Sequence, residues 1–310
     1  MKRKILNCLL LTGWVGVLVV GQRVGAAEPR VIELWPEGVP NLNTNLSGDK
    51  VVSNRIVSVQ KPSMLVFTPD PTNASGSAVI FCSGGGYVRI SVPQDGGSLT
   101  RQMTAEGLTV FMLKYRLSDY GHPAPLQDVL RAVRIVRSRA AEFGIKPDHI
   151  GVMGASAGGH LAGCAATIWD SPAGKTGAAL DAVSARPDFA VLIYPVVTMA
   201  DTFVHKGSRD ALLGKSPSPE LLDELSVERQ VRKDSPPMFI AATMADKTVP
   251  VENSLHLYQA LRDAGVPAEM HVYAQGSHGN SQDPKYGPTA EWPKRLEEWL
   301  RFNGWLNQTN

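Results

Sequence analysis

The chain has 310 residues, of which 43% are hydrophobic and 19% are charged, and its formal net charge is +2. A chain of this length and apolar content can bury a full hydrophobic core, which favours one large α/β domain over two small ones. No basic patch or run of like charges stands out, so the composition gives no support to nucleic acid or a membrane surface as a partner. The sequence leaves the oligomeric state open.

The first 27 residues have the pattern of a secretory signal. Basic residues at 2–4 precede an uncharged, mostly apolar run at 5–20, and small residues at 24–27 offer a cleavage site near Ala26 or Ala27. The apolar run is short for a membrane span, so an uncleaved anchor is the weaker alternative. Cleavage would remove four basic residues and no acidic one, which leaves 27 basic against 29 acidic residues and a net charge of −2. We therefore expect a secreted or periplasmic protein with no stable membrane partner, whose single catalytic domain covers residues 28–310.

Residues 28–50 are rich in Pro, Asn and Gly, and we expect them to form an irregular arm laid over the domain. Beyond them, short β-type runs alternate with helical patterns. We predict strands at 55–59, 64–68, 78–82, 108–114, 149–153, 189–194, 238–243 and 269–273. We predict helices at 97–106, 126–143, 157–168, 251–264 and 290–303. From residue 78 onward this order indicates a mostly parallel sheet with helices on both faces, and the two early strands are expected to form an antiparallel edge.

Two groups of side chains within these elements receive structural interpretations. Arg131, Arg134 and Arg137 alternate with apolar residues at helical spacing, so we expect them to form the solvated face of their helix. Cys82 and Cys164, the two cysteines beyond the signal, are expected to be free, buried thiols. A disulfide between them is the alternative, which would require a geometry that sequence does not reveal.

One long stretch breaks the alternation of strands and helices. About forty residues separate the strand at 189–194 from the strand at 238–243, and they contain only short helical patterns. An insertion after a sheet strand would lie over the carboxyl edge of the sheet, where open α/β sheets bind ligands. We interpret residues 196–236 as a small cap that helps to shape a substrate pocket.

Residues 154–158 read Gly-Ala-Ser-Ala-Gly and lie between a predicted strand and a predicted helix, which is the pattern of a nucleophile elbow. A serine hydroxyl is a weak nucleophile, so it needs a neighbouring base to take its proton and donors to stabilise the oxyanion. Glycines relieve crowding at such a corner, and the start of the helix supplies free N–H groups. We predict Ser156 as the nucleophile and the N–H of Ala157 as one oxyanion donor.

Residues 83–87 read Ser-Gly-Gly-Gly-Tyr and follow directly after the strand predicted at 78–82. A glycine run lets backbone N–H groups approach a substrate oxygen without obstruction by side chains. The alternatives are a plain flexible turn or a phosphate loop, but the following Gly-Lys-Ser/Thr that a phosphate loop needs is not present. We predict Gly84 and Gly85 as oxyanion donors and Tyr87 as a substrate-binding residue.

Asp246 and His278 follow the last two predicted strands. A carboxylate at this edge can hold a histidine in the correct tautomer, and the histidine can act as the general base for Ser156. Asp246 could instead cap the next helix, and six other histidines occupy ordinary positions in the predicted elements. The chain order Ser, Asp, His is the α/β-hydrolase order, which chymotrypsin-like and subtilisin-like enzymes do not share. We therefore predict a triad of Ser156, Asp246 and His278 in an α/β-hydrolase fold, with no metal site and no cofactor.

The motifs as a set resemble those of secreted α/β-hydrolase esterases grouped with acetyl xylan esterases and hormone-sensitive-lipase-like enzymes, of the BD-FAE type. The resemblance extends over about residues 33–302 and includes the matching segments at 34–40, 83–87, 115–117, 122–128, 154–161, 192–195, 246–253 and 276–279. It implies the same roles for the glycine loop and the triad. Relatives usually carry His or Pro where this chain has Ser83, and Gly85 is our first choice for the donor in that loop.

The resemblance implies a serine carboxylesterase that removes acetyl groups from carbohydrate through an acyl-enzyme. A general short-chain esterase or lipase is the nearest alternative, although the predicted cap is rich in charged residues and does not look like an apolar lid. A peptidase of the prolyl-oligopeptidase type is disfavoured, because the chain has no room for a large β-propeller. A non-catalytic binding module is disfavoured by the complete triad.

Overall fold

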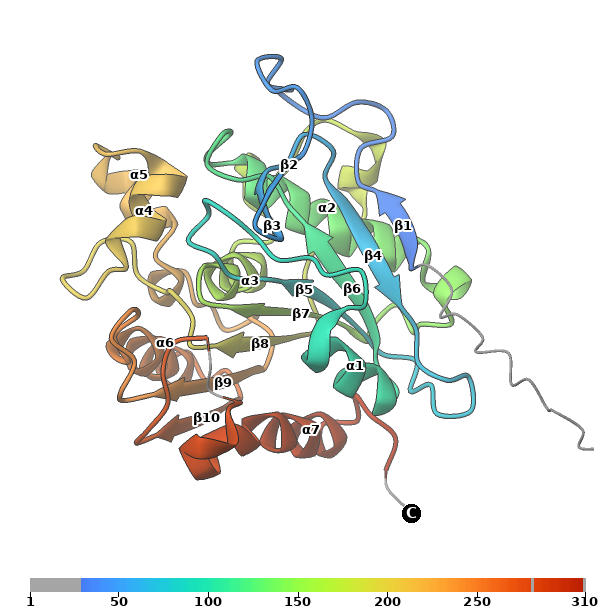
Figure 1. Cartoon of the computed structure of the whole chain (residues 1–310), viewed down its shortest axis with the longest axis vertical. Coiled ribbons are helices and arrows are strands. Elements are labelled where there is room, and N and C mark those ends of the chain that lie inside the picture. Colours follow the sequence, from blue (N-terminus) through green and yellow to red (C-terminus); the bar gives the residue numbers. More distant parts are fainter. Residues whose placement is uncertain (1–28, 280–281, 309–310) are drawn as a thin grey trace, which may run out of the picture.

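A computed structural model describes residues 29–279 and 282–308, and the predicted signal at 1–27 lies outside these described residues. An eight-stranded sheet runs through the centre of the domain (Figure 1). In sheet order its strands are β1 (Arg30–Glu33), β4 (Ser63–Phe67), β6 (Thr109–Lys114), β5 (Ala78–Cys82), β7 (Ile150–Ala155), β8 (Phe189–Ile193), β9 (Met238–Thr243) and β10 (Ala268–Tyr273). β1 and β4 pair antiparallel, as do β4 and β6, and the remaining neighbours are parallel.

The sheet has helices on both faces. The α-helices that the structure describes are α1 (Gly97–Ala105), α2 (Ala124–Ser138), α3 (Ala157–Thr167), α4 (Lys206–Leu213), α5 (Pro219–Glu224), α6 (Glu252–Asp263) and α7 (Trp292–Phe302). Short 3-10 turns occupy Ala140–Phe143, Pro172–Gly174, Ala179–Ala182, Val227–Arg229 and Pro284–Glu291. The predicted mostly parallel sheet with helices on both faces is confirmed.

Two hydrophobic clusters fill the space between the sheet and its helices. The larger contains buried residues of α2, α3 and α6, and the smaller contains those of α1 and α7. Side chains alternate along β5, so that Ile80 belongs to the larger cluster and Val79 to the smaller. Both are fully buried. The central strands therefore read as continuous apolar runs because both of their faces are covered.

The N-terminal part of the sheet differs from the prediction. The expected irregular arm contains β1, which pairs with β4 and buries Ile32. The strand expected at 55–59 does not join the edge; β3 (Arg55–Ser58) pairs with β2 (Lys50–Val52) in a separate two-stranded sheet. β1 was missed because it has four residues and only one of them is buried, too short a pattern to reveal alternation.

The prediction of a solvated arginine face on α2 is wrong. Arg131 and Arg134 are only 6% and 2% exposed. Arg131 donates to the carbonyl of Leu34 at 3.0 Å, and Arg134 donates to the carbonyl of Gly174 at 3.1 Å. Segments remote in sequence cover this face of the helix and accept hydrogen bonds from its guanidinium groups, which helical periodicity does not reveal.

Cys82 and Cys164 are free and buried, as predicted. Within the described ranges, no helix is long and apolar enough to cross a membrane.

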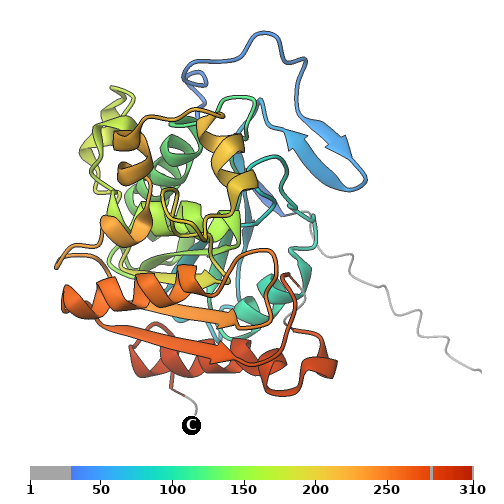
Figure 2. The ribbon, with the colours of Figure 1, turned by 90° about the vertical axis from the view of Figure 1, so that its left-hand side faces the viewer.

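The segment predicted as a cap contains α4 and α5. Figure 1 shows both helices on the side toward which the arrowheads of the parallel strands point, and Figure 2 views the molecule from that side. Asn253 of α6 anchors the start of this segment: its side-chain oxygen accepts from the amides of Val197 (2.9 Å) and Thr198 (3.2 Å), and its amide nitrogen donates to Phe203.

Candidate active site

Ser156 lies at the corner between β7 and α3, in a backbone conformation that non-glycine residues seldom adopt. Its φ and ψ are 56° and −124°. The corner is held by hydrogen bonds on both sides of the residue: Ser156 N donates to Ile193 O at 3.0 Å, and Ser156 O accepts from the amides of His160 and Val196 at 3.1 Å each. Strain of this kind persists only where the surroundings fix it, and it lifts the side chain above the sheet edge.

The glycines on either side of the corner are required by close backbone contacts. A Cβ on Gly154 would lie 2.0 Å from the carbonyl oxygen of Gly158, and a Cβ on Gly158 would lie 2.1 Å from that of Cys82. No side chain fits either position without displacing backbone. The tight corner therefore demands glycine two residues before and two residues after Ser156.

The structure brings the three predicted triad residues into one line of hydrogen bonds. Ser156 Oγ lies 2.7 Å from His278 Nε2, and His278 Nδ1 lies 2.7 Å from Asp246 Oδ2. Ser156 follows β7, Asp246 follows β9 and His278 follows β10. The carboxyl ends of these parallel strands lie at the same edge of the sheet. An ionised carboxylate accepts the Nδ1 proton, which leaves Nε2 free to accept from the serine hydroxyl.

Asp246 is held in its ionised form. Burial alone raises the pKa of its carboxyl, but the hydrogen bond from His278 and those from the amides of Val249 and Thr248 outweigh that effect and lower it. These amides donate to Oδ1 at 3.0 and 2.8 Å. The carboxylate is therefore fixed in orientation as well as in charge.

The predicted oxyanion donors lie around Ser156. A Cβ on Gly84 would lie 3.0 Å from the Cβ of Ser156, and Gly85 has a φ of +145° that only glycine adopts readily. Ala157 is the first residue of α3, so its N–H has no acceptor within the helix. Among the turn, loop and cap hydrogen bonds of the described residues, none is donated by the backbone N–H of Gly84, Gly85 or Ala157. Their role as oxyanion donors stays a prediction.

The prediction for Tyr87 is wrong, because its side chain points into the core. Tyr87 is 1% exposed, and its hydroxyl lies 2.7 Å from His160 Nδ1. The other ring nitrogen of His160 lies 2.7 Å from the carbonyl oxygen of Leu225, so the ring donates there and accepts from Tyr87. Tyr87 has a φ of 62°, which turns its side chain away from the glycine loop it follows.

Ser156 and His278 open onto a cavity of about 620 Å³. Its other lining residues come from the glycine loop, the β2–β3 hairpin, the strand ends and the cap. They are Arg55, Gly84, Gly85, Gly86, Val88, Arg89, Ala155, Tyr194, His205, Gly207, Thr248 and Gly279. A cavity of this size holds a small substrate or one or two sugar units.

Tyr194 and His205 are cavity residues that the sequence prediction missed. The Tyr194 ring lies edge-on to His278, with 4.9 Å between ring centroids, and burial raises the pKa of its hydroxyl to about 12. Burial and repulsion from His278 lower the pKa of His205, whose Nδ1 accepts from the amide of Ser208 at 3.2 Å. The proton of His205 therefore resides on Nε2. Tyr194 is the last residue of the strand predicted at 189–194 and could have been found by its place at the sheet edge, whereas the only signal for His205 was its place in the predicted cap.

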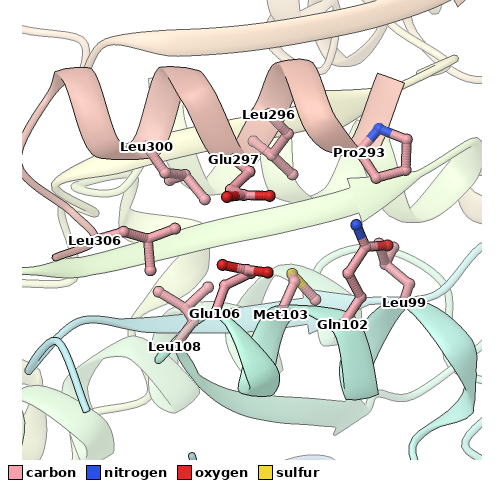
Figure 3. Close-up of a pocket in the computed structure, with 10 residues that line it drawn as sticks. All are labelled: Leu99, Gln102, Met103, Glu106, Leu108, Pro293, Leu296, Glu297, Leu300 and Leu306. Carbon is pink, nitrogen blue, oxygen red and sulfur yellow. The ribbon is translucent and has the colours of Figure 1, made fainter. Parts of the chain in front are cut away.

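A second hollow lies between α1 and α7, on the other side of the sheet from α3, and is not a candidate site. Figure 3 shows its mostly apolar lining, with the carboxylates of Glu106 and Glu297 pointing toward each other. Its volume of about 20 Å³ is enough for roughly one water molecule. Both carboxylates bind Arg301. The hollow is a packing gap closed by an ion pair.

Within residues 29–279 and 282–308, no group of three or more His, Cys, Asp or Glu side chains is placed to hold a metal ion.

Comparison with known protein families decides the relationship of this chain. The BD-FAE family model matches residues 64–261, which include Ser156 and Asp246. The chain belongs to the BD-FAE family. His278 lies beyond the matched residues, and its link to the family site rests on its contacts with Ser156 and Asp246.

Two curated relatives of this chain have names that refer to xylan. An acetylxylan esterase from Xylanibacter ruminicola is 34% identical over 223 residues, covering 71% of this chain and 44% of that protein. Endo-1,4-beta-xylanase B from Butyrivibrio fibrisolvens is 36% identical over 200 residues, covering 63% of this chain and 31% of that protein. This chain therefore spans less than half the length of these two curated relatives. The resemblance to acetyl xylan esterases is confirmed.

Solved structures confirm the α/β-hydrolase fold. An acetyl ester-xyloside bifunctional hydrolase from Caldicellulosiruptor lactoaceticus has a TM-score of 0.79 at 35% identity, covering 91% of this chain and 100% of that one. A thermophilic esterase from Thermogutta terrifontis, solved with propionate bound, has a TM-score of 0.68 at 25% identity and covers 85% and 97% of the two chains. These neighbours are carboxylic ester hydrolases.

Proposed function

We propose that this protein is a secreted serine carboxylesterase that removes acetyl groups from carbohydrate. The observation that carries the proposal is the continuous hydrogen-bond line from Asp246 through His278 to Ser156 at the wall of an open cavity. The substrate class is supported by the names of the acetylxylan esterase and the acetyl ester-xyloside hydrolase among its relatives. Export is supported by the apolar run at residues 5–20.

The reaction proceeds in two acyl transfers. His278 Nε2 takes the proton of Ser156 as Oγ attacks the ester carbonyl, and the resulting oxyanion accepts hydrogen bonds from the amides of the glycine loop and of Ala157. His278 then gives the proton to the leaving sugar hydroxyl, and the acetyl group stays on Ser156. Water, deprotonated by His278, attacks the acetyl-enzyme and releases acetate. Asp246 stays ionised and stabilises the imidazolium in both steps.

The cap favours a polar substrate over a lipid. His205 of the cap lines the cavity together with Ser156 and carries its proton on Nε2, and Thr248 adds a hydroxyl to the same lining. A hydroxyl-rich alcohol can accept or donate hydrogen bonds to such groups, whereas a long acyl chain gains nothing from them. The cavity therefore suits a short acyl group on a sugar.

Hydrolysis of acetate esters tests this proposal. The wild type should release nitrophenol from 4-nitrophenyl acetate and acetate from acetylated xylan, with lower kcat/KM for butyryl esters and lower still for octanoyl esters. Ser156→Ala should lose at least about a thousandfold in kcat, because no nucleophile replaces the hydroxyl. Ser47→Ala, a change at an exposed serine, is the matched control and should keep the wild-type rate. Wild-type activity in Ser156→Ala would refute the mechanism, and equal rates on all three acyl lengths would favour a general esterase.

A further inference from the structure

Two arginines in the wall of the cavity have no acidic partner. Among the arginines that the structure describes, three form no ion pair: Arg55, Arg89 and Arg186. Arg186 has other partners, because it donates to the carbonyl of Asp234 and packs over the ring of Trp169. Arg55 and Arg89 both line the cavity, and none of its lining residues is Asp or Glu. The cavity wall thus carries two guanidinium groups and no carboxylate, although the chain as a whole is close to neutral.

The backbone fixes both arginines on the same face of a short bridge. Ile56 of β3 and Ile90, beyond the glycine loop, form an antiparallel bridge, with two reciprocal hydrogen bonds of 2.9 Å. Ile90 is fully buried and Ile56 packs against the same core. Since side chains alternate across an extended backbone, Arg55 and Arg89, each one residue before the bridge, project on the opposite face.

Arg89 also lies close to the predicted oxyanion loop. A Cβ built on Gly85 would lie 3.0 Å from the Cγ of Arg89 and 1.9 Å from its carbonyl oxygen. A turn with Gly85 O accepting from the amides of Val88 and Arg89 holds the two residues together. A group bound by Arg89 is therefore close to an ester whose carbonyl oxygen occupies that loop.

We propose that Arg55 and Arg89 form an anion subsite, which binds a carboxylate on the alcohol part of the ester, as an acidic sugar would supply. The proposal rests on the function proposed above: because the acyl group is acetyl, any charged group that reaches the arginines belongs to the alcohol. Guanidinium groups bind carboxylates through paired, charge-assisted hydrogen bonds. The two arginines come from different segments, so one carboxylate can be held from two sides.

A pair of acetylated methyl glycosides tests the subsite, one of glucuronic acid and one of glucose, which differ only in the carboxylate. Acetate release at pH 7 and low salt should show kcat/KM about tenfold higher for the acidic ester in the wild type. This ratio should fall to about one in the Arg55→Gln/Arg89→Gln double variant and should recover in part in the corresponding double Lys variant. Because exposed charges are screened by salt, it should also shrink in 0.5 M NaCl.

Lys50→Gln is the matched control, because Lys50 lies in the same hairpin and is exposed but does not line the cavity. Its ratio should equal that of the wild type. A wild-type ratio near one, with the neutral ester hydrolysed, would overturn the anion subsite and leave the esterase proposal standing. An equal loss of the ratio in Lys50→Gln would also overturn it, since general attraction would then explain the preference. If the wild type hydrolysed none of the three substrates, neither glycoside ester nor 4-nitrophenyl acetate, both proposals would be overturned.

Discussion

The carboxylate of Asp246 has its two oxygens committed to different partners. Oδ2 faces His278 Nδ1, while Oδ1 accepts from the amides of Thr248 and Val249. The amides orient the group, so the proton on His278 is held on Nδ1 and the lone pair on Nε2 faces Ser156. At the scale of single residues, the proposed mechanism makes the reactivity of Ser156 depend on a carboxylate that does not touch it.

Asp246→Asn should preserve the fold and remove most of the activity. An asparagine oxygen can still accept from the two amides, which turns its NH₂ group toward His278 Nδ1. That nitrogen must then be an acceptor, so Nε2 carries the proton and cannot deprotonate Ser156. We expect kcat on 4-nitrophenyl acetate to fall by about 10⁴-fold. Asp70→Asn is the control: Asp70 makes similar bonds to Thr72 on the surface, and its variant should match the wild type.

Sequence could predict that Ser156, Asp246 and His278 come together, because each follows a strand and parallel strands bring their carboxyl ends to one edge. It could not predict where side chains after the glycine loop would point. Tyr87 follows that loop directly, yet a positive φ turns its side chain into the core, while Arg89, two residues later, lines the cavity. The direction of a side chain in a turn depends on backbone angles that tertiary contacts set.

At the scale of elements, His160 joins three parts of the structure around the site. It belongs to α3, its Nδ1 accepts from Tyr87 beyond the glycine loop, and its Nε2 donates to Leu225 at the end of α5. Burial lowers the pKa of His160 to about 4. Between about pH 4 and about pH 6.5, the ring is therefore neutral in the folded protein but charged in the unfolded chain.

This difference in pKa between the folded and unfolded states makes the free energy of unfolding fall as the pH is lowered. Below an unfolded-state pKa of about 6.5, the unfolded chain binds a proton at this position that the folded protein does not. The contribution of the neutral ring is therefore complete above pH 6.5 and is lost as the pH falls toward 4. Between pH 7 and pH 5 we expect it to reduce the free energy of unfolding by about 2 kcal/mol.

Urea unfolding at pH 7 and pH 5 measures this loss. His160→Gln, which is less stable at both values, should show a smaller decrease than the wild type because it has no proton to bind. His256→Gln, a change at an exposed histidine of α6, should decrease as the wild type does. If the free energy of unfolding decreased by the same amount between pH 7 and pH 5 in the wild type and in His160→Gln, groups other than His160 would cause the pH dependence.

The bounds of the elements were largely predictable, since apolar periodicity marks each buried strand and helix. The strands at 78–82 and 238–243 agree residue for residue with β5 and β9. What periodicity cannot show is the cover provided by distant segments. Arg131 looks solvent-facing on its helix, but the carbonyl of Leu34 and the ring of Trp35, from the N-terminal arm, cover it.

At the scale of the whole molecule, a buried ion pair links segments far apart in the sequence. Arg116 and Asp128 are fully buried, with 2.8 Å between Arg116 Nη2 and Asp128 Oδ1. The Nε1 of Trp35 also donates to Asp128 at 2.7 Å, and Arg116 donates to the carbonyl of Pro40 at 2.7 Å. The pair thus fastens the N-terminal arm to the end of β6 and to α2.

Asp128→Asn should strongly destabilise the protein, because it leaves the charge of Arg116 buried without compensation. We expect the free energy of unfolding to fall by about 3–5 kcal/mol. Asp95→Asn, which alters the exposed Arg101–Asp95 pair, should change it little. Thermal or urea unfolding at neutral pH compares the two variants. A similar small effect in both would mean that the buried pair does not hold the arm in place.

Labelling of the nucleophile tests the central claim that Ser156 carries the acyl group. Treatment with paraoxon should stop ester hydrolysis and add one diethylphosphoryl group, which mass spectrometry of a digest should locate on Ser156. Ser156→Ala should gain no such group. Modification of a different residue in step with the loss of activity, or full activity in a protein labelled at Ser156, would contradict the account.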